Sequence, residues 1–99
     1  MAEYTLYCFA QSGNAYKAAL MLNLCNADWA PRFVDFFNGE TRTPEYRAHV
    51  NEMGEVPVLE FGGKRLSQSG VILDFLAATS ENFDWTNRNE HREVMRWIL

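Results

Sequence analysis

A single hydroxyl stands where a strand-like segment gives way to a helix-like segment near the start of the chain. Residues Tyr4 to Phe9 are rich in aromatic side chains, and apolar residues recur at helical spacing from Ala15 to Leu24. Ser12 lies in the polar turn between them. Because a helix N-terminus carries free N–H groups and partial positive charge, a hydroxyl there could hydrogen-bond a thiolate and keep it ionised. The alternative is an ordinary N-cap, a role that Asn14 could also fill.

A proline at the start of a strand-like segment is the second feature that could serve a ligand. The segment GEVPVLEF contains Val56-Pro57, and Val56 to Phe61 reads as a strand. Proline cannot donate to a sheet ladder, so it lies at a strand start or an edge. A cis bond here would leave the backbone of Val56 free for an extended peptide ligand. A trans proline at a strand start is the alternative.

The segment LSQSGVIL brings together three kinds of hydrogen-bonding group. Gln68 and Ser69 stand at the start of a helix-like run. A hydroxyl, a side-chain amide and free backbone N–H groups therefore converge there, a set suited to an α-amino-acid carboxylate. A serine cap beside a neutral glutamine is the alternative.

The remaining patterns predict the elements that position these residues. Thr43-Pro44-Glu45 is a helix-start signal, and Gly54 is suited to the left-handed end of that helix. Gly62-Gly63 is typical of a two-residue hairpin turn. The expected strands are Tyr4 to Phe9, Arg32 to Phe37, Val56 to Phe61 and Lys64 to Leu66, and the expected helices begin near Ala15, Thr43, Gln68 and Asn87.

This order predicts an α/β fold with a mixed four-stranded sheet. The first half is a βαβ unit with parallel strands, and the second half adds a hairpin and a helix, so helices should cover both faces. We expect one domain over residues 3–79 and a linker over 80–86. Asn87-x-x-Glu90 resembles a capping box, and residues 87–99 are expected to begin a further helix.

Composition narrows the class of protein. The chain has 99 residues, 47% of them hydrophobic, a formal net charge of -4 and a pI near 5.0. These values indicate a folded domain and disfavour a nucleic-acid partner. No apolar run is long enough to span a membrane, and the start lacks the features of a secretory signal, so we expect a cytoplasmic protein. Cys8 and Cys25 lack the spacing of a redox pair or a zinc site, so no metal is expected and both read as buried thiols.

The three motifs together resemble the N-terminal, thioredoxin-like domain of cytosolic glutathione S-transferases. LYCFAQSGNAYKAALML is similar to the family's first strand, active-site loop and first helix. EMGEVPVLEFGGKRLSQSGVILDFLA is similar to its cis-proline, hairpin and Gln/Glu-Ser segment. The resemblance runs from about Tyr4 to Ala78, and Ser12 matches the serine-type, bacterial-like classes.

The resemblance implies a glutathione site along the edge of the sheet. Glutathione, the co-substrate, would lie extended beside cis Val56-Pro57, with the Val56 backbone pairing with its cysteinyl part. Gln68 and Ser69 would hold the γ-glutamyl end. Ser12 would stabilise the glutathione thiolate, which attacks a small electrophile. Asn14 would then be the structural cap and is also a candidate glutathione contact.

One residue departs from the family pattern. Many members carry Lys immediately before Val-Pro, where it holds the glycyl carboxylate, but this chain has Glu55; Arg42 and His49 are candidate replacements. We also expect this chain to be the front part of a longer protein, because residues 87–99 would be only the start of the first helix of the family's all-helical second domain, which borders the electrophile. Members are usually homodimers.

The sequence therefore predicts the glutathione-binding half of a glutathione transferase. The alternative is a non-catalytic binding or assembly module built on the same fold. A glutaredoxin-like reductase is disfavoured because no cysteine occupies the active-site loop.

Overall fold

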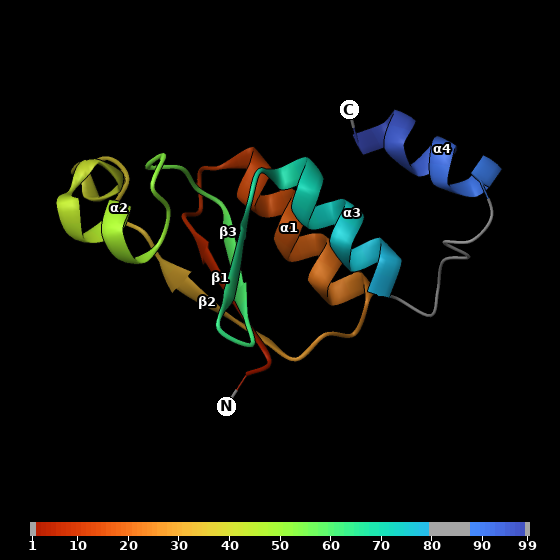
Figure 1. The fold of residues 1–99 in the computed structure, drawn as a ribbon, viewed down its shortest axis with the longest axis horizontal. Helices are drawn as coiled ribbons and strands as arrows, with labels where there is room; N and C mark the ends of the chain where they lie inside the picture. The colour runs from red at the N-terminus through yellow and green to blue at the C-terminus, as the bar shows by residue number, and fades with distance from the viewer. Residues whose placement is uncertain (1, 80–87, 99) are drawn as a thin grey trace.

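The elements of the domain follow the predicted order, with one short 3-10 helix added. The computed structural model describes residues 2–79 and 88–98. The elements are β1 (Tyr4–Cys8), α1 (Gly13–Leu24), β2 (Trp29–Phe33), η1 (Glu40–Arg42), α2 (Pro44–His49), β3 (Val58–Phe61), β4 (Lys64–Ser67), α3 (Ser69–Thr79) and α4 (Arg88–Ile98) (Figure 1).

The strands form one mixed sheet in the order β2-β1-β3-β4. β1 runs parallel to β2 and antiparallel to β3, and β3 pairs antiparallel with β4. Gly62 and Gly63, which join β3 to β4, have φ angles of 53° and 77°. Two consecutive positive φ angles fit a tight hairpin turn, which glycine adopts at no steric cost. The predicted mixed four-stranded sheet and its hairpin are confirmed.

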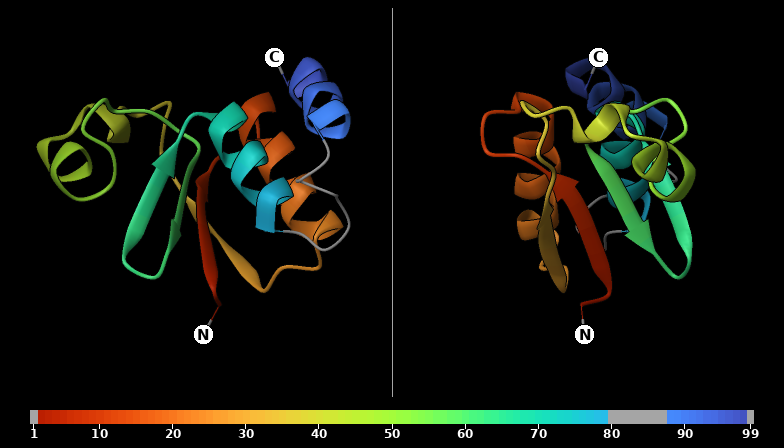
Figure 2. Two further views of the ribbon diagram at one scale, coloured as in Figure 1. Left: turned by 45° about the vertical axis from the view of Figure 1, so that its right-hand side comes forward. Right: turned by 90° about the vertical axis from the view of Figure 1, so that its left-hand side faces the viewer.

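Helices lie on both sides of the sheet. α1 and α3 lie side by side against one face, and α2 lies on the opposite side, as Figure 2 shows from two directions. We call the sides the helix-pair face and the α2 face. The arrangement confirms the thioredoxin-like layering that the sequence predicts.

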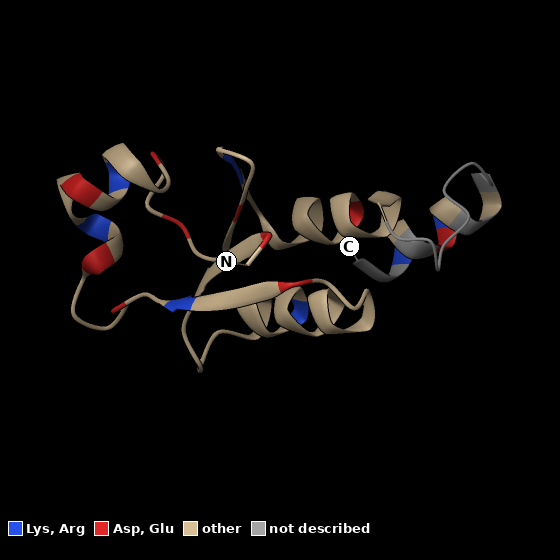
Figure 3. Ribbon diagram, turned by 90° about the horizontal axis from the view of Figure 1, so that it is seen from below, with Lys and Arg blue, Asp and Glu red and all other residues tan. Residues whose placement is uncertain are grey.

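Charged side chains are sparse on the helix pair and frequent on α2. Lys17 is the single Lys, Arg, Asp or Glu of α1, and Asp74 is the single one of α3. In contrast, η1 and α2 alternate acidic and basic residues (Figure 3). α1 and α3 therefore have the composition of helices that are covered on more than one side.

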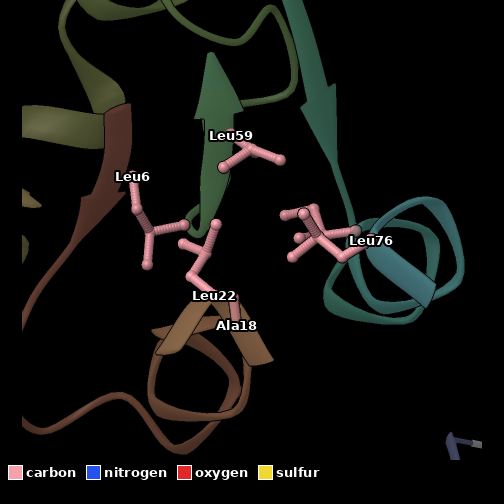
Figure 4. Packing of buried hydrophobic residues seen from close by; sticks show 6 residues of the cluster. Leu6, Ala18, Leu22, Leu59 and Leu76 are labelled. Atoms are coloured by element: carbon pink, nitrogen blue, oxygen red, sulfur yellow. The ribbon is translucent and has the colours of Figure 1, made fainter. Parts of the chain in front are cut away.

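The core of the helix-pair face is built from alternate residues of the two central strands. Leu6 of β1 and Leu59 of β3 are paired in register and fully buried. Both point toward α1 and α3 (Figure 4). Burying a leucine side chain contributes about 1.5–3 kcal/mol, so this cluster is a main source of stability. Its buried members are Leu6, Ala18, Leu22, Leu59, Ile72 and Leu76.

The next residues of the same strands face α2. Tyr7 and Val58 are paired in register and pack with Val34 and with Tyr46 of α2. The Tyr46 side chain is 3% exposed, and its hydroxyl donates a hydrogen bond to the Glu55 carbonyl at 2.6 Å. Burial raises the pKa of Tyr46 to about 12. The phenol therefore stays a hydrogen-bond donor at physiological pH and ties α2 to the segment before β3.

The second strand is displaced from its predicted position. It spans Trp29–Phe33, whereas the sequence predicted Arg32 to Phe37. The register with β1 sets these bounds, because Tyr4 pairs with Trp29 and Cys8 with Phe33. Pro31 fits within the strand because β2 is an edge strand, where a missing N–H need not interrupt a ladder.

Helix α2 begins as predicted but ends earlier. Thr43 caps it through a hydrogen bond from the Tyr46 N–H at 3.1 Å, yet the helix stops at His49 rather than near Gly54. The Asn51 side-chain oxygen accepts hydrogen bonds from the N–H groups of Met53 and Glu55. These bonds satisfy the backbone in a non-helical turn, which competes with another helical turn.

The end of the chain is described in part. The expected linker over 80–86 and the Asn87 cap lie outside the described residues. Residues 88–98 form the expected helix, α4, which lies against α3 with His91 Nε2 3.4 Å from Asp74 Oδ1. Within residues 2–79 and 88–98, every helix is too short or too polar to cross a membrane.

Gly54 is expected to tolerate no side chain. Its φ is +68°, and a Cβ would lie 2.6 Å from the Thr41 carbonyl oxygen. We expect Gly54→Ala to lower the free energy of unfolding by about 2–4 kcal/mol, combining the left-handed backbone cost with steric overlap. Urea denaturation measures this loss.

Gly62→Ala is the matched control. Gly62 also has positive φ, but nothing lies within 4 Å of the position that a Cβ would take there. Gly62→Ala should lower the free energy of unfolding by about 1–2 kcal/mol, because only the left-handed backbone conformation is unfavourable for alanine there. Equal losses in the two variants would contradict the close contact at Gly54.

Candidate functional site

The strand register brings the three predicted segments to one edge of the sheet. The pairing of Tyr7 with Val58 places Pro57 beside the end of β1, from which the Ser12 turn departs. The pairing of Val58 with Ser67 places Gln68 beside Pro57. The N-termini of α1 and α3 and the start of β3 therefore lie together at this edge.

Ser12 is the N-cap of α1. Its backbone is extended, with φ -81° and ψ 113°, and its Oγ accepts a hydrogen bond from the Ala15 N–H at 3.0 Å. Asn14 lies inside the helix, so the expectation that Asn14 is the cap is wrong: a cap must lie outside the first helical residue, which is Gly13. Because a hydroxyl also carries one donor hydrogen, capping fixes the Oγ and leaves that hydrogen available.

The Val56-Pro57 bond is cis, as the resemblance implies. Pro57 is buried, and the half-buried Val56 side chain packs against the cluster on the α2 face. Neither the N–H nor the C=O of Val56 has a hydrogen-bond partner among the described residues. This backbone is available to a strand-like ligand.

Gln68 and Ser69 form the start of α3. Gln68 has a φ of +72°, and its carbonyl accepts from the Ile72 N–H at 3.0 Å, so Gln68 occupies the cap position. Ser69 is the first helical residue and is half-buried. The first N–H groups of a helix have no intrahelical acceptor, so this end has the hydrogen-bonding groups that a carboxylate requires.

Glu55 lies at this edge, and the sequence patterns assigned it no role. Its carboxylate oxygen Oε2 accepts a hydrogen bond from Gln68 Nε2, while Oε1 is buried without a partner among the described residues. The signal that could have revealed this contact is position, because residues 55 and 68 flank the two ends of the β3–β4 hairpin.

An apolar groove borders Ser12 on the side of α1 and β2. Its volume is about 430 Å³. Phe9 stacks on Phe36 at a centroid distance of 4.7 Å, and Phe37 meets both rings edge-on. Burial raises the pKa of the Cys8 thiol in the groove wall, so Cys8 is a poor nucleophile. The groove is lined by Cys8, Phe9, Ala10, Ser12, Ala15, Tyr16, Ala19, Pro31 and Phe33.

The two further candidates, Arg42 and His49, lie apart from this hydrogen-bonded set. Arg42 ends η1 and His49 ends α2, and both are exposed. Within the described residues neither contacts Val56, Gln68 or Ser69 through a hydrogen bond or ion pair. No group of His, Cys, Asp and Glu in the same residues is arranged to hold a metal ion.

This fold and site define a class of protein. Its members are thioredoxin-like domains with a cis-proline and two helix N-termini at one edge of the sheet. Residues 2–78 match the family model for the N-terminal domain of glutathione S-transferases. The chain therefore belongs to the glutathione S-transferase family.

Individual relatives agree with this assignment. A maleylacetoacetate isomerase from Rhizobium meliloti is 38% identical over 79 residues, which are 80% of this chain and 37% of that protein. The crystal structure of a possible glutathione S-transferase from Rhodopseudomonas palustris is 37% identical with a TM-score of 0.85, covering 97% of this chain and 49% of that one.

A glutathione transferase homologue from Sulfitobacter, solved with bound glutathione, has a TM-score of 0.83 at 26% identity. The matched region is 99% of this chain and 49% of the homologue's chain. The chain thus spans between about a third and a half of the length of these relatives.

Replacing the capping hydroxyl should destabilise the domain. We expect Ser12→Ala to lower the free energy of unfolding by about 1 kcal/mol, because the Ala15 N–H loses its acceptor. Asn14→Ala should change it by less than about 0.5 kcal/mol, since Asn14 is a helix residue exposed to solvent. Urea denaturation distinguishes the two, and the reverse order of losses would contradict the assignment of the cap.

Proposed function

We propose that this chain is the glutathione-binding half of a glutathione transferase of the serine type. The observation that carries the proposal is the convergence at one edge of the Ser12 hydroxyl, the Val56 backbone, which has no hydrogen-bond partner among the described residues, and the start of α3. The family membership and the glutathione bound to the Sulfitobacter homologue support it.

Glutathione would bind as an extra strand beside the cis-proline. Its cysteinyl part pairs with the N–H and C=O of Val56, and Pro57 holds this backbone at the edge. The γ-glutamyl carboxylate lies at the N-terminus of α3, on the Ser69 hydroxyl and the free N–H groups. The glycyl carboxylate lies toward α2, where Arg42 and His49 are the candidate hydrogen-bond donors.

Ser12 would stabilise the sulfur of the ligand without attacking anything itself. A free thiol has a pKa of about 8.5, so it is mostly protonated at neutral pH. Lowering that pKa by about two units takes about 2.7 kcal/mol of preference for the thiolate. A hydroxyl hydrogen bond together with the α1 N-terminus is of this order.

The thiolate would then attack a small electrophile. The apolar groove beside Ser12 supports an apolar substrate, since 430 Å³ is the volume of a small-molecule pocket. Such a reaction needs no metal from the protein, because the activated nucleophile is the ligand's own sulfur.

The rest of the electrophile site would come from an all-helical second domain that begins at residues 87–99. Two observations support this. The relatives are about twice as long as this chain. In addition, Tyr16, Leu20 and Leu24 leave the outer side of α1 apolar and exposed. In this proposal residues 3–79 are the binding domain and 80–86 the linker.

Glutathione titration tests the proposal directly. Calorimetry at millimolar glutathione should detect binding to the 99-residue chain or to a longer protein that contains it. If neither binds, the enzyme proposal fails and the non-catalytic binding module replaces it.

Ser69 offers a sharper test of the binding mode. Ser69→Ala should weaken glutathione binding about tenfold, because a hydrogen bond to a carboxylate is lost. Ser67→Ala, two residues earlier on β4 and also half-buried, should change it by less than about threefold. Equal effects would argue against a carboxylate at the start of α3.

The sulfur-stabilising role of Ser12 predicts a shifted thiol pKa. Following the ultraviolet absorbance of bound thiolate against pH, we expect Ser12→Ala to raise the pKa of bound glutathione by about one to two units. Ser12→Thr keeps a hydroxyl and should preserve the wild-type value. An unchanged pKa in Ser12→Ala would remove this role from Ser12.

A further inference from the structure

Glu55 and Gln68 form a hydrogen-bonded pair at the two ends of the β3–β4 hairpin. Gln68 Nε2 donates to Glu55 Oε2. A carboxylate only accepts hydrogen bonds, so this contact fixes the direction of the amide, with Nε2 toward Glu55 and Oε1 left over. An amide that could have offered either a donor or an acceptor therefore offers an acceptor to a ligand.

The backbone of Glu55 is held on both sides. Its N–H donates to Asn51 Oδ1 at 3.0 Å, and its carbonyl accepts from the Tyr46 hydroxyl at 2.6 Å. Tyr46 belongs to the buried cluster of the α2 face. The core therefore fixes where the Glu55 side chain begins.

The second carboxylate oxygen of Glu55 has no hydrogen-bond partner in the described part of the chain. Oε1 is buried, and within the described residues no Lys, Arg or His forms an ion pair with Glu55. The guanidinium of Arg65, on β4, is instead paired with Glu60 at 3.1 Å. A buried carboxylate oxygen without a partner is unfavourable, and a cationic N–H donor would satisfy it.

We propose that Glu55, together with the Oε1 of Gln68, binds the ammonium group of the amino acid whose carboxylate lies at the start of α3. This inference rests on the proposed function, since the γ-glutamyl end of glutathione is a free α-amino acid with both groups. Glu55 is then a specificity-determining residue. It selects ligands with a free α-amino group, and as a negative charge it does not hold the glycyl carboxylate.

The test compares glutathione with its deaminated analogue, glutaryl-cysteinylglycine, which keeps both carboxylates and the thiol. We expect the wild-type protein to bind glutathione about tenfold or more tightly than the analogue, as charged hydrogen bonds of this kind produce. Glu55→Gln preserves the shape of the side chain and removes its charge. In this variant the preference for glutathione over the analogue should fall below about threefold.

Glu52→Gln is the matched control. Glu52 is an exposed glutamate three residues away, and its substitution removes the same charge from the same loop. Because the analogue is more negative than glutathione, removing any nearby carboxylate shifts the ratio somewhat, and Glu52→Gln measures that general effect. Circular dichroism verifies that both variants are folded.

The outcomes separate the two proposals. Equal affinity of the wild-type protein for both ligands would overturn the role of Glu55 while leaving glutathione binding intact. That role is also overturned if Glu55→Gln and Glu52→Gln change the ratio equally. If the wild-type protein binds neither ligand, the proposed function falls, and this inference falls with it. The ratio of the two affinities in the wild-type protein is measured without any variant, so this test can be made even if a variant fails to fold.

Discussion

The antiparallel pairing of β1 with β3 is the constraint on which the rest of the structure depends. These two central strands alternate their side chains between the two faces of the sheet, so Leu6 and Leu59 enter one core while Tyr7 and Val58 enter the other. A shift of one residue would exchange the two sets and leave both faces mismatched. The same register fixes where β1 ends and β3 begins, and therefore where the edge with Ser12, Val56 and Gln68 lies.

Polar groups at that edge serve the fold and remain available for chemistry. Ser12 accepts a hydrogen bond from the α1 backbone through its oxygen, while its hydrogen has no acceptor within the described part of the chain. Gln68 closes the start of α3 with its carbonyl and contacts Glu55 with its side chain. Each residue is fixed by a structural hydrogen bond, which holds the remaining group in place before any ligand arrives and reduces the entropy lost on binding.

Predictions from short sequence motifs were correct where the residue type alone determines the backbone conformation. Gly62-Gly63 was predicted as a hairpin turn and Thr43 as a helix cap, and both are found because glycine conformation and capping depend on a few neighbouring atoms. The predicted bounds of two elements were wrong for different reasons. The bounds of β2 depend on its pairing with β1, which is distant in sequence. The end of α2 depends on the Asn51 side chain, whose hydrogen bonds to nearby N–H groups stabilise a non-helical turn.

The sequence by itself determined the order of elements, the mixed sheet and the segments that meet at the site, since hydrophobic period, turn residues and the three motifs are all local patterns. The tertiary structure alone decided two points. It assigned the cap to Ser12 rather than Asn14, because only one of them lies outside the first helical residue. It also brought Glu55 to Gln68, because two residues thirteen positions apart become neighbours only when β3 and β4 pair.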